Sequence, residues 1–183
     1  IYLMLMVADI KLKRGGMIIL KQNKLLFKNF STFLALGFGS GLINKAPGSF
    51  GTLVAIPFFL FLQFLSEPLI YLFIFTMFFI GIYVADKTSE VLAMDDPSCI
   101  VIDEIVGFLL LLIMVGHFPE TGILITGIDF ILAFILFRIF DIWKPFPINI
   151  LEKRFKGGFG IMIDDIGAAL YAYIIFRLIH YAI

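Results

Sequence analysis

The sequence contains little cysteine, little histidine and no excess of charge of either sign. Its single cysteine, Cys99, excludes an intramolecular disulfide and gives no indication of an oxidising compartment. Fourteen basic and fourteen acidic residues cancel, so the net charge indicates no class of partner, and we predict no nucleic-acid partner. A Walker phosphate-binding pattern is absent too. Function must therefore be inferred from where the charged residues lie along the chain.

Apolar residues are abundant instead. They make up 61% of the 183 residues, against about 45–50% in soluble globular proteins, and the mean hydropathy is +1.06. The length fits one domain. Because a membrane-spanning helix needs about 20 apolar residues, we predict an all-α, polytopic membrane bundle of about four to five apolar helices. The predicted segments are residues 53–65, 69–85, 100–115, 122–140 and 166–183, with 33–42 packed at the membrane interface.

The loops between these segments differ in charge. All but one of the fourteen basic residues lie in the amino-terminal region or near the loops after the second and fourth segments, and Arg177 is the exception. The positive-inside rule places these regions in the cytoplasm and the carboxyl terminus outside. His117 and His180 then belong to the outer side, which disfavours histidine-based chemistry at the cytoplasmic face. We expect Asp129, in mid-span, to be hydrogen-bonded to a neighbouring helix.

Acidic residues gather at the predicted cytoplasmic helix ends. In the motif IVIDEIVG, Asp103 and Glu104 interrupt an apolar run, where an ionised carboxylate at bilayer depth costs about 2.5–3.5 kcal/mol. We predict that this helix starts at Pro97 and that Asp96 caps it, two turns before Asp103 on the same face. Asp96 could serve only as a cap, but capping does not require two further acids inside the apolar stretch.

Two further motifs bring acids to the same side. In FRIFDIWKPFP, Arg138 and Asp141 are three residues apart on one helix face, and Lys144 precedes the proline that ends the helix. In FKGGFGIMIDDIGAA, Asp164 and Asp165 lie near the start of the last helix, where the helix dipole favours negative charge. The simpler alternatives are a single ion pair in the first motif and dipole complementarity in the second.

A glycine-rich stretch, GFGSGLINKAPGSFGT, precedes the first apolar segment. Glycine-rich turns expose consecutive backbone N–H groups that can cradle phosphate, and Lys45 and Ser49 lie within this stretch. The alternative is that the glycines only permit close packing of helices.

Together these helix ends bring several carboxylates to one membrane face. Packed like charges repel one another unless a cation intervenes, and hard oxygen ligands without histidine or cysteine suit Mg²⁺. Basic side chains beside such an ion suit a phosphate ester. A Cys-x5-Arg loop, the DxDx(T/V) acylphosphate motif and the D-x2-D-G-x2-A-R pattern of alcohol phosphotransferases are all absent. The pattern indicates a magnesium site that handles phosphate.

At these residues the chain resembles the phosphatidylglycerophosphatase A family. The motifs GFGSGLINKAPGSFGTLVAIP, IVIDEIVG, FRIFDIWKPFPI and GGFGIMIDDIGA stand in that family's order and spacing, over about residues 33–180. The resemblance implies a multi-pass enzyme of the bacterial inner membrane that depends on Mg²⁺. Such an enzyme removes the terminal phosphate of phosphatidylglycerophosphate, giving phosphatidylglycerol, and we expect its active site to lie on the cytoplasmic side of the bilayer.

The resemblance also divides the chain. Residues 33–183 would form the membrane domain, after a basic amino-terminal extension over residues 1–32. Whether the chain starts at Ile1 or at Met17, with the residues before Met17 a reading artefact, stays open. Cys99, Asp95 and Lys45 depart from the pattern expected of the family.

The residues are assigned as follows. We predict Asp103, Glu104, Asp141, Asp164 and Asp165 as catalytic, Arg138, Lys144, Lys45 and Ser49 as binding the substrate phosphate, and Asp103, Glu104, Asp141, Asp165 and Asp96 as holding Mg²⁺. Attack by water and an aspartyl-phosphate intermediate are both open. The alternatives are a cation-coupled transporter that uses the acids as an ion site, and a structural subunit with a basic partner. The oligomeric state is left open.

Overall fold

The computed structural model describes residues 29–116 and 126–182, in which helices are joined by loops and no strand is present. The helices follow in the order α3 (Phe30–Ala35), the short 3₁₀ helix η1 (Gly37–Leu42), α4 (Pro47–Leu62), α5 (Glu67–Leu92), α6 (Ile102–Gly116), α7 (Gly127–Trp143), α8 (Ile148–Arg154) and α9 (Gly157–Ala182). The prediction of an all-α fold is confirmed. Predicted residues 122–125 and the amino-terminal extension up to residue 28 lie outside the described part.

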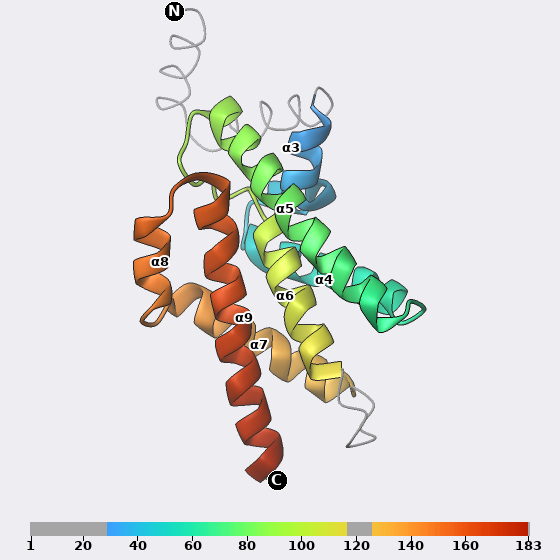
Figure 1. Cartoon of the computed structure of the whole chain (residues 1–183). Helices are drawn as coiled ribbons and strands as arrows, with labels where there is room; N and C mark the ends of the chain where they lie inside the picture. The colour runs from blue at the N-terminus through green and yellow to red at the C-terminus, as the bar shows by residue number, and fades with distance from the viewer. Residues whose placement is uncertain (1–28, 117–125, 183) are drawn as a thin grey trace, which may run out of the picture.

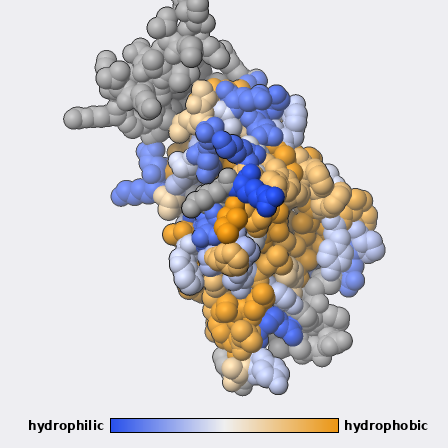
Figure 2. Space-filling model, turned by 60° about the vertical axis from the view of Figure 1, so that its left-hand side comes forward, coloured by the Kyte–Doolittle hydropathy of each residue, from blue (hydrophilic) through white to orange (hydrophobic). Residues whose placement is uncertain are grey.

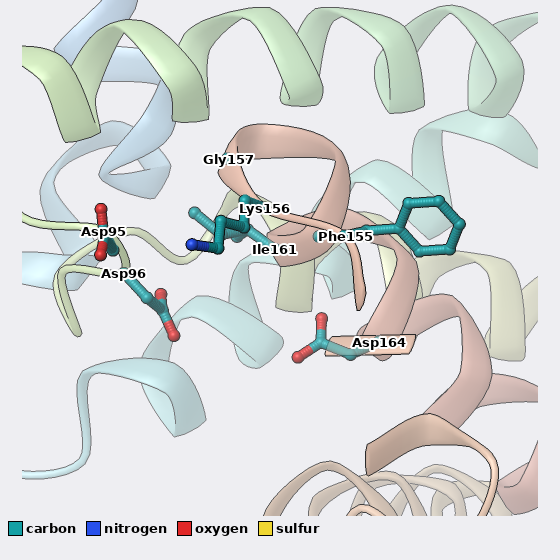
Figure 3. A pocket seen from close by; sticks show the side chains of 8 residues that line it. Asp95, Asp96, Phe155, Lys156, Gly157, Ile161 and Asp164 are labelled. Atoms are coloured by element: carbon teal, nitrogen blue, oxygen red, sulfur yellow. The ribbon is translucent and has the colours of Figure 1, made fainter. Parts of the chain in front are cut away.

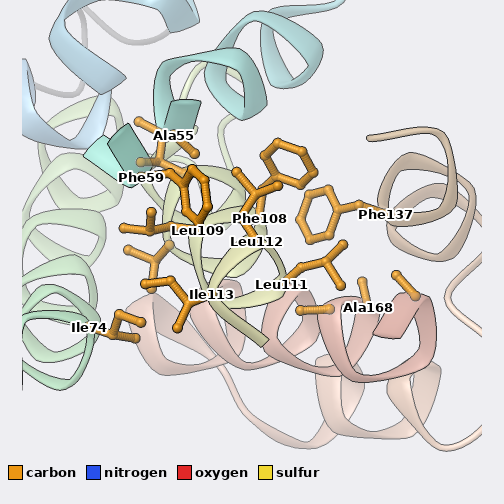
Figure 4. Close-up of a cluster of buried hydrophobic side chains, with 14 of the residues drawn as sticks. Ala55, Phe59, Ile74, Phe108, Leu109, Leu111, Leu112, Ile113, Phe137 and Ala168 are labelled. Atoms are coloured by element: carbon orange, nitrogen blue, oxygen red, sulfur yellow. The ribbon is translucent and has the colours of Figure 1, made fainter. Parts of the chain in front are cut away.

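Helix α6 forms the centre of the bundle. It contacts α4, α5, α7 and α9, and α5, α6 and α9 run side by side (Figure 1). After the acidic pair of its first turn, the sequence of α6 is apolar on every face, which is typical of a central buried helix. Phe108, Leu109, Leu111 and Leu112 are completely buried, and they meet side chains of the four surrounding helices (Figure 4).

Gly107 allows α6 to approach α9 closely. A Cβ atom at this position would lie 2.9 Å from the carbonyl oxygen of Asp165 in α9. Only glycine lets the two backbones approach so closely, as small residues do at helix interfaces in membranes. This contact therefore sets the distance between the start of α6 and the acidic pair of α9.

The outer surface of the bundle is largely apolar. Hydrophobic residues cover most of the lower part of the face seen in Figure 2, and hydrophilic residues gather in its upper part. Two helices, α5 and α9, each of 26 residues, are long and apolar enough to cross a membrane. This agrees with a membrane-associated protein. The described helices do not confirm the predicted count of four to five spans, because α4, α6 and α7 have 16, 15 and 17 residues.

Two predicted helix starts are wrong. Helix α6 begins at Ile102 and not at Pro97. The backbone before it is held in other ways: the Ile100 N–H donates to the Pro97 carbonyl at 2.8 Å, and the Val101 N–H donates to the Ala35 carbonyl at 2.9 Å. Helix α9 begins at Gly157, nine residues before the predicted start at Ile166.

Asp129 does not lie in mid-span. It occupies the first turn of α7, where its carboxylate accepts from the Thr126 N–H at 2.8 Å, and Thr126 Oγ1 accepts from the Asp129 N–H. This reciprocal capping box fixes the start of the helix at Gly127. The expected bond to a neighbouring helix is present, because Asp129 Oδ1 lies 3.0 Å from His180 Nε2 in α9.

Candidate active site

A polar cavity of about 250 Å³ lies where the starts of α4, α6 and α9 meet the end of α7. Ten of the residues singled out by the sequence can be placed relative to it. Eight of them line the cavity: Asp96, Asp103, Glu104, Arg138, Asp141, Lys144, Asp164 and Asp165. The predicted convergence of acids from separate helices on one end of the bundle is therefore present in the structure.

Three of these carboxylates form a tight group. One oxygen each from Asp103, Glu104 and Asp165 lie within 4.8 Å of one another. Asp165 is only 2% exposed, and Asp103 Oδ1, Glu104 Oε2 and Asp165 Oδ2 are buried without a hydrogen-bond partner among the described residues. Buried carboxylates that repel one another and lack donors are unfavourable unless a cation or protons join them.

Arg138 links α7 to this acidic group. Its Nη1 lies 2.5 Å from Asp141 Oδ2 on the same helix and 3.5 Å from Glu104 Oε1 of α6. The predicted i, i+3 pairing of Arg138 with Asp141 is confirmed, and the second partner shows that it is more than an isolated pair at a helix end. Arg138 Nε is buried and has no hydrogen-bond partner within the described part of the chain.

Lys144 forms a second bridge between helices. It ends α7 in the left-handed conformation, with φ of 44°, and its Nζ lies 2.6 Å from Asp164 Oδ2 of α9. Asp164 Oδ1 accepts in turn from the Asp165 N–H at 3.0 Å. Asp164 is therefore engaged by Lys144 and by its own helix, whereas its neighbour Asp165 faces the carboxylates of α6.

The glycine-rich stretch reaches the site through its backbone. Ala46, Pro47 and Gly48 line the cavity, and a Cβ at Gly48 would collide with the Glu104 carboxylate. Glycine at this position thus serves close packing, which was the simpler alternative. Lys45 is exposed and lies outside the lining of the cavity.

Ser49 lies outside the lining of the polar cavity as well. It lines instead an apolar cavity that shares Arg138 with the polar one. The phosphate-binding roles predicted for Lys45 and Ser49 therefore have no support from their positions.

A third cavity, of about 280 Å³, adjoins the polar one and shares Asp96, Ile161 and Asp164 with it. Figure 3 shows Asp96 and Asp164 facing it from two sides, with Lys156 between α9 and the loop that carries Asp95. Asp96 lines this third cavity and the polar one, and it is not a member of the tight group of three carboxylates. It is not the cap of α6, because α6 starts six residues later.

Asp86 of α5 is a residue that the sequence did not single out. Its Oδ1 accepts a hydrogen bond from the Gly158 N–H in the first turn of α9. A carboxylate at this place pairs with an otherwise unsatisfied N–H and with the positive end of the helix dipole. The glycine pair before the acidic motif was the available signal, since it marks a helix start that another element can approach closely.

An all-helical bundle with an apolar exterior, and with buried carboxylates beside half-buried basic side chains at one end, has the make-up of a membrane-associated enzyme acting on phosphate esters. A family model described as Phosphatidylglycerophosphatase A matches residues 33–180. Over 149 residues the chain is 41% identical to a Phosphatidylglycerophosphatase A of Haemophilus influenzae, covering 81% of this chain and 87% of the relative.

A second relative, the Phosphatidylglycerophosphatase A of Escherichia coli, is 36% identical over 149 residues, or 81% of this chain and 83% of the relative. No solved structure matches the chain. The chain belongs to the phosphatidylglycerophosphatase A family. The resemblance and the prediction of an enzyme, a phosphatase, are thereby confirmed.

Proposed function

We propose that the protein removes the terminal phosphate of phosphatidylglycerophosphate, releasing phosphatidylglycerol and inorganic phosphate. The observation that carries this proposal is the polar cavity, in which Arg138 and Lys144 stand beside buried carboxylates at one end of an apolar bundle. A lipid held in a leaflet presents its phosphate at headgroup level, where such a cavity can receive it. Membership of the family and the names of both relatives support the substrate.

The tight carboxylate group fits Mg²⁺. Asp103, Glu104 and Asp165 would hold the ion, since they offer only oxygen ligands and three buried oxygens that lack donors in the described structure. Asp141 and Asp96 line the nearby cavity walls and would act through water or substrate. When bound, Mg²⁺ supplies positive charge that polarises the phosphoryl oxygens.

The chain's own residues contribute binding and proton transfer. Arg138 and Lys144 offset the negative charge of the phosphate, which in the transition state is spread over the phosphoryl oxygens and grows on the leaving oxygen. A carboxylate of the cavity takes a proton from the attacking water, or attacks phosphorus itself to form an aspartyl phosphate that water then hydrolyses. In both routes the P–O bond to the glycerol oxygen breaks, and that oxygen ends protonated.

The setting we propose is the bacterial inner membrane, with a multi-pass chain and the site at the cytoplasmic face. Helices α5 and α9 have the length and composition for crossing, and the charge distribution of the loops supports this orientation. Ion transport is not favoured. The buried acids of the described residues sit near the two ends of the bundle, Asp164 and Asp165 at one and Asp129 at the other, with the apolar core between them.

The test is phosphate release from phosphatidylglycerophosphate by protein purified in detergent, with Mg²⁺ and with a chelator. We expect Asp165→Asn and Asp103→Asn to lower kcat by at least about a hundredfold, the usual scale for losing one electrostatic group of an active site. Glu90→Gln is the matched control, because Glu90 is an exposed acid paired with Lys87 away from the cavity. Near-normal turnover by both aspartate variants would end the assignment of this site.

A further inference from the structure

An apolar groove of about 480 Å³ lies on the outside of α7, next to the polar cavity. Five side chains of α7 form most of its lining, namely Phe134, Ile135, Ile139, Ile142 and Trp143. Ser49 of α4 and Arg138 are its polar members. The exposed fractions of Ile139 and Ile142 are 47% and 74%, so the groove opens outward over the side of the bundle.

Arg138 joins this groove to the candidate active site. It lines both cavities, and its Nη1 lies 3.5 Å from Glu104 Oε1, one of the three clustered carboxylates. A molecule lying in the groove with a polar group at Arg138 is therefore already beside the carboxylates. The exposed apolar residues of α5, such as Phe75 and Phe79, have no such connection, because they line neither cavity.

We infer that the groove binds an acyl chain of the phospholipid substrate, while its headgroup passes Arg138 into the polar cavity. The inference rests on the proposed function and adds to it the place where the lipid tail is recognised. One molecule would thus be held at both ends, by apolar contacts with Ile135, Ile139 and Ile142 and by charge at the phosphate. Trp143 lines the groove at the end of α7, next to Lys144 of the polar cavity, a position that suits an interfacial aromatic ring.

This arrangement predicts selectivity for long chains. Burying one further methylene strengthens binding by about fourfold. A substrate whose acyl chain places several methylene groups in the groove should therefore bind much more tightly than one with a shorter chain. A short-chain phosphatidylglycerophosphate that is soluble as a monomer would use the groove less. The ratio of kcat/KM for the long-chain substrate to kcat/KM for the short-chain substrate therefore reports occupation of the groove.

The experiment compares this ratio in wild-type protein, Ile139→Trp and Ile174→Trp, all in the same detergent. Ile139→Trp fills the groove, and its partial exposure leaves room for the larger ring. Ile174→Trp is the matched control, since Ile174 is the same residue type, 55% exposed, on α9 and outside the lining of the groove. We expect Ile139→Trp to lower the ratio at least about tenfold, the equivalent of two methylene contacts, and Ile174→Trp to leave it at the wild-type value.

Ile135→Trp provides a second filling variant should Ile139→Trp fold poorly, and the same fall is expected. Two results would overturn the assignment of the groove as an acyl-chain site and leave the proposed function standing. One is a wild-type ratio of the two kcat/KM values in a folded, active groove variant, and the other is an equal fall of that ratio in Ile174→Trp. Wild-type protein that hydrolyses neither substrate would overturn the proposed function and this inference with it.

Discussion

Replacing Gly107 by alanine tests whether the carboxylate cluster depends on the close approach of α6 and α9. The added Cβ would lie 2.9 Å from the Asp165 carbonyl oxygen and 3.0 Å from the Asp165 Cβ. Ordinary van der Waals contact begins at 3.4 Å, so the helices have to separate by about 0.5 Å. Rotation of a side chain cannot relieve the clash, because the atoms belong to the backbone and to a Cβ.

Two effects of different size follow. Over-packing of a well-packed interface costs about 1–3 kcal/mol, which lowers the Tm by about 2–4 °C per kcal/mol for a chain of this length. The same shift moves Asp165 away from Asp103 and Glu104. Because a misplacement of about 1 Å can cost a hundredfold in rate, we expect kcat to fall about tenfold to a hundredfold. We also expect a rise in the Mg²⁺ concentration that gives half the maximal rate.

The assay is phosphate release as a function of Mg²⁺ concentration, with a thermal melt of the same preparation. Gly127→Ala is the control, since a Cβ at Gly127 meets nothing within 4 Å, and it should behave as wild type in both measurements. A Gly107→Ala protein with wild-type kcat and wild-type Mg²⁺ dependence would refute the argument that helix spacing sets the geometry of the site.

Three further predictions concern other residues. Asp86→Ala removes the acceptor of the Gly158 N–H and should lower the free energy of unfolding by about 1.5–3 kcal/mol. Glu90→Ala, at an exposed ion pair, should lower it by less than about 1 kcal/mol. Equal losses of the two variants in urea melts would contradict a stabilising role of the Asp86–Gly158 hydrogen bond. Arg138→Lys keeps the charge but loses the planar fork that reaches two carboxylates, so kcat/KM should fall about tenfold or more, and an unchanged value would show that charge alone suffices. Burial raises the pKa of the Cys99 thiol to about 11, so alkylation of the folded protein at neutral pH should be far slower than in denaturant and should accelerate with rising pH up to that value; labelling at equal rates would show that Cys99 is accessible.

The site could be predicted from the sequence where charge interrupts an apolar pattern. Asp103 and Glu104 fall in the first turn of a helix that is otherwise apolar and largely buried, and Arg138 and Asp141 pair at helical spacing. These features depend on neighbours within one segment, which periodicity and hydropathy report directly. The positive-inside rule and the family's motif order together indicated that these separate segments meet at one end of the bundle.

The errors lie where tertiary contacts override local signals. Pro97 and Asp96 have the residue types of a helix start, but the backbone up to Val101 is committed to a turn and to α3. The start of α9 was predicted too late, because the apolar segment begins only after Asp164 and Asp165, whereas the helix already begins at Gly157. Asp86 was missed since its partner, the Gly158 N–H, is distant in sequence. The roles of the individual acids stay predictions.

The three clustered carboxylates are also synthesised at different times. Asp103 and Glu104 leave the ribosome with α6, but Asp165 follows only with α9, the last of the described helices. During synthesis Asp103 and Glu104 therefore precede Asp165, and the group of three carboxylates is complete only once α9 packs along α6. A chain that ends before α9 lacks one of the three carboxylates and therefore cannot form the group.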